Sequence, residues 1–166
     1  MRPLVVTLAI DDPAQHRFDD ERRRYFPADR YQVGAHLTLF HALPGEEIDT
    51  AARDLHRCTG ASFELTVTDV ISLGRGVAYL LASSDLVTRH RQLQRSWRDM
   101  LTAQDRQPLR PHVTVQNKVA PDVARSTLAA LRGIFTPFAV NAIGYDVWRY
   151  DGGPWSHVTR IPFESP

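Results

Sequence analysis

The sequence has little of several features that place a chain in a specialised class. Cys58 is its only cysteine, so no disulfide can form within the chain, and no group of cysteine and histidine has zinc-finger spacing. No segment approaches the roughly 18 apolar residues that a membrane-spanning helix needs. The apolar run at residues 4–10 is too short for a secretory signal, and acidic residues follow it at once. We therefore expect a reducing, cytoplasmic location and no membrane anchor.

An excess of charge of one sign is also missing. The chain has 20 lysines and arginines against 19 aspartates and glutamates, which gives a formal net charge of +1. This balance argues against a strongly electrostatic nucleic-acid binder, although a local basic surface is compatible with it. The length of 166 residues allows one domain with a sizeable core, and no shift in composition marks a linker. Residues 1–166 are therefore expected to form a single domain.

The chain does contain one short pattern twice. Residues 36–39 (HLTL) and residues 112–115 (HVTV) both read histidine, apolar, threonine, apolar. In a β-strand, side chains two residues apart share a face and lie about 7 Å apart along the strand. Each motif therefore predicts a strand with its histidine and threonine on one face and its apolar residues turned toward the core.

The two histidines together make a complete acid–base pair if their strands lie side by side. The pKa of an unperturbed imidazole is about 6.5, so one of His36 and His112 can accept a proton near neutral pH while the other donates one. The hydroxyls of Thr38 and Thr114 can bind anionic oxygens without adding charge. These groups suit a phosphodiester, and the sequence leaves open which histidine is the base.

The paired motifs resemble those of the two-histidine (2H) phosphoesterase superfamily, in particular its 2′-5′ RNA ligase-like branch. Residues 148–155 (WRYDGGPW) are also similar to the tail of bacterial members. The resemblance implies an α+β, bilobal, internally duplicated fold, with antiparallel sheets flanking a central cleft and helices on the outside. It implies a metal-independent phosphodiesterase or 2′-5′ RNA ligase that uses no cofactor. Its substrates would be RNA ends with a 2′,3′-cyclic phosphate, or related small cyclic or 2′-5′-linked nucleotides. The catalytic residues would be His36, Thr38, His112 and Thr114.

The hydrophobic patterns predict two similar halves. Strands are expected at residues 4–10, 35–43, 63–70, 77–82, from about 110, 138–150 and 156–163. Helices are expected from about residue 12 to 25 and at 46–58, 85–103 and 122–132.

Five further side chains are predicted to contact the substrate. Arg110 and Gln116 continue the face of the second motif, where a guanidinium can grip a phosphate oxygen. Phe40 continues the face of the first motif. Its ring, like those of Tyr79 and Trp155, can stack on a base.

Other polar residues receive ordinary interpretations. His41 would point away from His36 in a regular strand, so a structural or exposed role is expected. The arginines of the first helix, such as Arg22, are predicted to form a solvated charged face, with a basic wall near a phosphate as the alternative.

Two other function classes remain open. A metallohydrolase would bind a metal through His36, His112 and His157 with a carboxylate, but no Asp or Glu stands beside either motif at ligand spacing. A non-catalytic RNA- or nucleotide-binding module of the same fold is the other, although both motifs are intact. The expected partner is an RNA end or a small nucleotide, and a monomer is expected.

Overall fold

The computed structural model describes residues 1–165. Its strands are β1 (Leu4–Ile10), β2 (Leu37–Leu43), β3 (Phe63–Ser72), β4 (Val77–Ala82), β5 (His112–Gln116), β6 (Phe138–Tyr150) and β7 (Trp155–Pro162). Its helices are α1 (Asp12–Tyr25), α2 (Ile48–Arg57), α3 (Ser84–Ser96) and α4 (Pro121–Ile134), with short 3₁₀-helices η1 (Ala28–Arg30), η2 (Gly45–Glu47) and η3 (Arg98–Met100). This order of elements agrees with the predicted one. No helix in the described part of the chain is long and apolar enough to cross a membrane.

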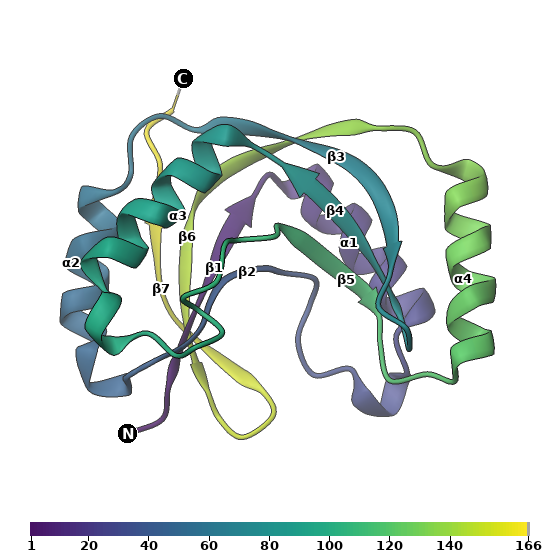
Figure 1. Cartoon of the computed structure of the whole chain (residues 1–166), viewed down its shortest axis with the longest axis horizontal. Helices are drawn as coiled ribbons and strands as arrows, with labels where there is room; N and C mark the ends of the chain where they lie inside the picture. Colours follow the sequence, from purple (N-terminus) through teal and green to yellow (C-terminus); the bar gives the residue numbers. More distant parts are fainter. Residues whose placement is uncertain (166) are drawn as a thin grey trace.

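The strands form a single antiparallel sheet that curls into an arch (Figure 1). Its order is β2-β1-β6-β3-β4-β5, and β7 also pairs with β6. The long strand β6 joins the two halves, because residues 138–142 pair with β3 and residues 142–150 pair with β1 and β7. The predicted α+β fold with outer helices is therefore confirmed, and its antiparallel strands are continuous through β6.

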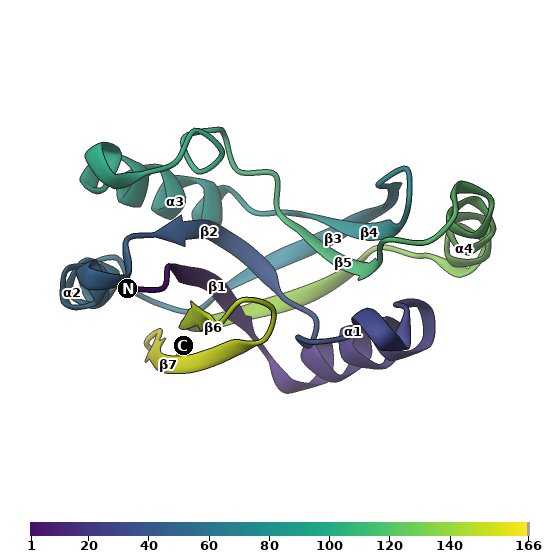
Figure 2. The same cartoon turned by 90° about the horizontal axis from the view of Figure 1, so that it is seen from below.

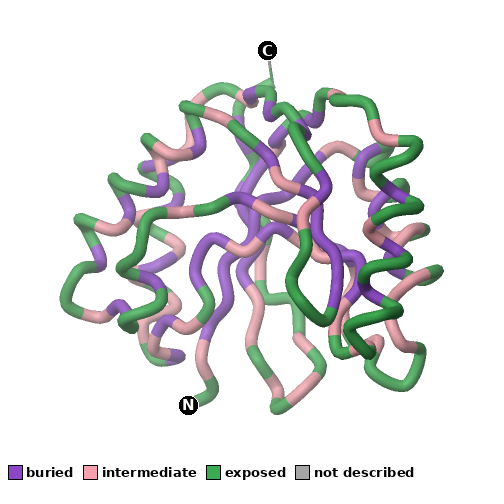
Figure 3. Tube along the Cα trace, turned by 45° about the vertical axis from the view of Figure 1, so that its right-hand side comes forward, coloured by how far each residue is buried: buried purple, intermediate pink, exposed green. Residues whose placement is uncertain are grey.

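Each motif strand is backed by a helix from the other half of the chain (Figure 2). Helix α1 packs on β5. Helix α3 packs on β2, where the ring of Phe40 lies 4.7 Å from that of His90 and 4.8 Å from that of Trp97. Buried residues concentrate along the strands (Figure 3), and one hydrophobic cluster includes residues of every strand. The two halves thus share one core.

The helix ends follow local side-chain chemistry. Asp11 caps the N-terminus of α1, where its carboxylate accepts a hydrogen bond from the backbone N–H of Ala14 at 3.0 Å. Helix α3 ends at Ser96, earlier than the predicted residue 103. The reason is Trp97, which turns into the core at 1% exposure and donates its indole N–H to Asp54 at 2.9 Å. After Trp97 the chain forms η3 and then an irregular segment that leads to the second motif.

Candidate active site

The two motif strands are brought together by the curl of the sheet. Strands β2 and β5 stand at opposite ends of the strand order, yet they contact each other. His36 immediately precedes β2, and His112 is the first residue of β5. The sheet therefore brings the two motif strands into contact, which is the condition for His36 and His112 to act as a pair.

The two motif histidines have the same ring hydrogen bond. Nδ1 of His36 lies 2.8 Å from the carbonyl oxygen of Gly34, and Nδ1 of His112 lies 2.8 Å from that of Arg110. A carbonyl oxygen only accepts, so Nδ1 carries the hydrogen in both rings, and Nε2 of the neutral ring is the bare nitrogen. Each ring is therefore oriented so that Nε2 can accept or donate a proton.

The electrostatic surroundings of His36 favour its neutral form. The pKa of His36 is lowered to about 4, mainly by burial. The charges of Arg22 and His112 contribute to this lowering, and the hydrogen bond to Gly34 opposes it. A neutral imidazole with a bare Nε2 is the form that acts as a general base. His36 is in this form at neutral pH.

A cavity of about 200 Å³ lies beside the second motif. Its lining includes Thr38, Arg110 and His112, so it joins side chains of both motif strands. The two motif threonines, Thr38 and Thr114, are both half-buried. Hydroxyls at such positions can donate to an anion held between the strands.

A bulge in each motif strand reverses the expected alternation. Thr7 and Val6 of β1 face Thr38 and Phe40 of β2, so one extra residue stands between them. In β5 the same happens between Thr114 and Gln116, which face consecutive residues of β4. A bulge of this kind turns the following side chain to the other face of the sheet.

The bulges overturn two predicted substrate contacts. Phe40 is 0% exposed and packs in the core. Gln116 is 2% exposed and donates its amide to the hydroxyl of Thr127 at 2.8 Å. Neither side chain can reach a substrate in this structure. Both predictions assumed regular strands.

The remaining three predicted contacts differ in placement. Tyr79 is 2% exposed and packs 5.4 Å from the ring of Phe18, so it is a core residue and not a stacking platform. Trp155 is half-buried at the start of β7, and its ring centroid lies 4.6 Å from that of His36. Arg110 is exposed and lines the cavity beside His112. Trp155 and Arg110 thus lie at the site, and Tyr79 does not.

The bulge in β2 brings His41 into the same cavity, contrary to the expectation that it faces away. The Asp105 carboxylate, 1% exposed, lies 2.8 Å from Nδ1 of His41 and accepts the backbone N–H groups of His41 and Ala42. Burial acts to raise the pKa of Asp105, but these hydrogen bonds lower it overall. The carboxylate therefore fixes the ring of His41 through Nδ1 and leaves Nε2 as its free nitrogen. The sequence offers no signal for this pair, which is separated by 64 residues.

Arg22 is a second feature that differs from prediction. It is 6% exposed, and its guanidinium donates to the carbonyl oxygens of Val33 at 3.0 Å and Thr114 at 2.7 Å. It thereby ties the loop before His36 to the second motif strand. The sequence does contain a signal for the burial of Arg22, because this residue follows Ala14 and Phe18, both buried, at four-residue spacing on one face of α1.

The arrangement expected of a metallohydrolase is not found. Nε2 of His157 lies 2.9 Å from the carboxylate of Asp146, which also binds Arg160. Within residues 1–165 no three or more His, Cys, Asp or Glu side chains are grouped to hold a metal ion. His157 does not join the two motif histidines in a ligand set.

Most of the sequence matches the model of a protein family. The family model described as the 2'-5' RNA ligase superfamily matches residues 10–154, which include both motifs. A comparison with curated proteins gave no match.

Several solved structures share the fold along the whole chain. TT0787 of Thermus thermophilus is 15% identical with a TM-score of 0.70, and the match covers 98% of each chain. Escherichia coli LigT complexed with NADP+ is 16% identical with a TM-score of 0.63 and the same coverage of both chains. LigT complexed with 3′-AMP is 15% identical with a TM-score of 0.61, again over 98% of each chain. At these identities the likeness concerns the fold.

Proposed function

Since this chain belongs to the 2'-5' RNA ligase superfamily and is an enzyme of the 2H phosphoesterase class, we propose that it hydrolyses 2′,3′-cyclic phosphates on RNA ends or smaller nucleotides. The observation that carries the proposal is the repeated geometry of His36 and His112. In both rings Nδ1 is engaged by a backbone carbonyl, which leaves Nε2 available for proton transfer. The two motif threonines add neutral donors for the phosphate oxygens.

The proposed step needs one base and one acid. Nε2 of His36 takes a proton from water as the water oxygen bonds to phosphorus. The acid is the doubly protonated ring of His112, whose Nε2–H gives its proton to the ribose oxygen whose bond to phosphorus breaks. The product is a phosphomonoester, and solvent returns the two rings to their starting protonation states. General acid–base catalysis of this kind contributes roughly 10²–10⁴-fold for each transfer.

The different surroundings of the two rings support this division of roles. The pKa of His36, lowered to about 4, keeps that ring neutral at working pH, as a base requires. His112 lines the cavity, where its ring can reach the departing ribose oxygen. The hydroxyls of Thr38 and Thr114 stabilise the charge that builds on the non-bridging oxygens. The imidazoles move the protons and the hydroxyls hold the anion, so this step requires no metal ion.

Two features support a nucleotide as the substrate. The half-buried ring of Trp155 lies against His36, where an aromatic face can stack on a base. LigT, which shares the fold, has been solved with NADP+ and with 3′-AMP. With a ribose 5′-hydroxyl in place of water, the same step joins two RNA strands.

The test is turnover of nucleoside 2′,3′-cyclic monophosphates, with EDTA present, by the wild type and by His36→Ala and His112→Ala. His56→Ala is the matched control, because His56 is exposed on α2. We expect hydrolysis by the wild type and the control, and losses of about 10²–10⁴-fold in the two motif variants. Circular dichroism checks that each variant is folded. Equal turnover by all four proteins, or none by the wild type, would contradict the proposal.

A further inference from the structure

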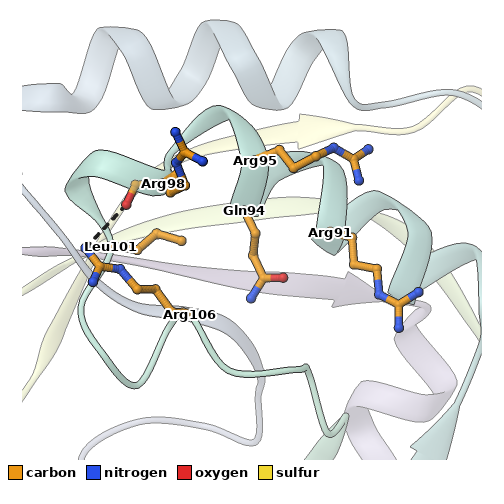
Figure 4. A pocket seen from close by; sticks show the side chains of 6 residues that line it. All are labelled: Arg91, Gln94, Arg95, Arg98, Leu101 and Arg106. Carbon is orange, nitrogen blue, oxygen red and sulfur yellow. Dashed lines mark hydrogen bonds between the residues drawn. The ribbon is translucent and has the colours of Figure 1, made fainter.

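A second hollow, rich in arginine, lies on the outer side of α3 and the turn that follows it (Figure 4). It has a volume of about 380 Å³ and is lined by Arg91, Gln94, Arg95, Arg98, Leu101 and Arg106. Its four arginines, Arg91, Arg95, Arg98 and Arg106, are exposed, and we call them the arginine surface. In a chain with a net charge of +1 they concentrate positive charge in one place.

The arginine surface has no counter-charge of its own. Within residues 1–165 none of its four members forms an ion pair. Asp99, although next to Arg98 in sequence, makes no such contact. Exposed guanidinium groups without acidic partners attract anions, and they hold phosphate oxygens with paired N–H donors.

The guanidinium groups are spread out and do not converge on one point. Arg91 and Arg95 lie one turn apart on α3, about 6 Å along its axis. Arg98 follows in η3, and Arg106 comes from the next loop. Figure 4 shows the four side chains pointing in different directions around Gln94 and Leu101. Such a spread suits a row of phosphates, since successive phosphates of a stacked strand rise by about 3.4 Å each.

One segment connects the arginine surface to the candidate active site. The amide of Gln94 donates to the backbone carbonyls of Asp105 at 2.9 Å and Gln107 at 2.8 Å. Asp105 and Gln107 line the active-site cavity, whereas Arg106 between them lines the arginine hollow. Arg91 also borders a hollow with Pro111, the residue before the second motif. The cavity beside His112 and the arginine hollow thus share the segment at residues 105–107, and an RNA strand whose end lies in the cavity can continue over this segment to the arginines.

We propose that the arginine surface binds the backbone phosphates of a single-stranded RNA whose cyclic end is processed at His36 and His112. The proposal rests on the proposed function and narrows its substrate class, because a mononucleotide cannot reach the arginines and the cavity together. The arginine surface then contributes to RNA binding but takes no part in proton transfer. The arginine surface would then be the local basic surface that is compatible with a net charge of +1 for the whole chain.

The test compares a triple variant, Arg91→Gln with Arg95→Gln and Arg98→Gln, with the wild type. A control triple variant, Arg24→Gln with Arg57→Gln and Arg125→Gln, removes the same charge from exposed positions on α1, α2 and α4. Turnover is measured on a short RNA ending in a 2′,3′-cyclic phosphate and on a nucleoside 2′,3′-cyclic monophosphate, at several salt concentrations. Binding of an RNA ending in a 3′-phosphate is followed by fluorescence anisotropy.

In the first triple variant we expect the KM for RNA to rise about tenfold or more, while turnover of the mononucleotide stays unchanged. The slope of log affinity against log salt should fall by about 2, since each lost contact to a single strand removes about 0.7. Values for RNA equal to those of the control variant would overturn the proposal, as would an equal loss on both substrates. If the wild type hydrolyses neither substrate, the proposed function fails. The anisotropy measurements alone then show whether the arginine surface binds RNA.

Discussion

At the residue scale, the two motif histidines each form the same kind of hydrogen bond, but their surroundings differ. Both rings are fixed through Nδ1 by the carbonyl two residues earlier. The pKa of His36 is lowered to about 4 by burial and, to a smaller extent, by the nearby charge of Arg22. The sequence shows two equivalent motifs, whereas the structure distinguishes their electrostatic surroundings.

The lowered pKa of His36 predicts that the acid side of the pH–activity profile lies at an unusually low pH. Activity requires neutral His36, and the pKa of His36 is lowered to about 4. We therefore expect kcat/KM for a cyclic nucleotide to fall with decreasing pH only near pH 4, and not near the ordinary histidine value of about 6.5. A pH series from 3.5 to 9 measures the limb. An acid limb at about 6.5 would contradict the assignment of His36 as the base.

His41 should contact the substrate through its free Nε2, which accepts a hydrogen bond from a substrate hydroxyl when Nδ1 carries the hydrogen toward Asp105. Replacing it with phenylalanine removes one hydrogen bond, worth about 0.5–1.5 kcal/mol, so kcat/KM should fall roughly 2- to 10-fold. Asp105→Asn should lower kcat/KM too, and it should also destabilise the fold by about 1–3 kcal/mol, because the amide group places a donor against backbone N–H groups. Steady-state kinetics and urea unfolding measure both effects. An unchanged kcat/KM in His41→Phe would contradict a contact with the substrate and would leave His41 with a structural role at the bulge of β2.

At the scale of elements, the β-bulges decide which side chains reach the site. The order of strands and helices could be predicted from hydrophobic periodicity, and the repeated motif predicted that His36 and His112 each share a strand face with a threonine. That the two strands lie side by side was a condition of the acid–base pair, which periodicity does not supply. Phe40 and Gln116 were assigned to the wrong face, because a single extra residue reverses the alternation that follows it. Such a bulge depends on pairing with distant strands, so the local sequence did not reveal it. Asp105 was missed for a similar reason, since only the tertiary fold brings it to β2.

The link between α1 and β5 through Arg22 gives a prediction at this scale. Arg22→Met keeps the side-chain volume but removes the donors to the carbonyls of Val33 and Thr114. The variant should lose about 1–3 kcal/mol of unfolding free energy. The pKa of His36 should also rise, because a nearby positive charge disappears. Urea unfolding and NMR titration of His36 measure the two effects.

Arg23→Met is the matched control for this variant. Arg23 is the next residue along α1, and its exposed side chain pairs with exposed Asp20. A surface ion pair of this kind contributes about 0–1 kcal/mol. The account fails at this point if Arg22→Met and Arg23→Met behave alike in both measurements.

At the scale of the whole molecule, the two halves are interlocked. Strand β6 pairs with strands of both halves, and each motif strand packs on a helix from the opposite half. The active-site cavity consequently depends on contacts between residues far apart in the sequence. Neither half can present a complete site by itself.

This interlocking predicts that the chain unfolds as one unit. All three tryptophans lie in the second half of the chain, but they contact residues of the first half: Trp97 packs on Phe40, Trp148 donates to Thr7, and Trp155 lies against His36. Their fluorescence therefore reports on the contacts between the halves, and it should give the same urea transition as far-UV circular dichroism. Two separated transitions would contradict a single cooperative unit.

The most direct test of the central claim is to change the leaving group. Hydrolysis of bis(4-nitrophenyl) phosphate releases nitrophenolate, which departs without a proton, whereas opening a 2′,3′-cyclic phosphate requires protonation of a ribose oxygen. If His36 is the base and His112 the acid, His36→Ala should lose activity on both substrates. His112→Ala should lose about 10²–10⁴-fold on the cyclic phosphate and far less on the nitrophenyl ester. Equal losses by His112→Ala on both substrates, or the reverse pattern between the two variants, would contradict the assignment.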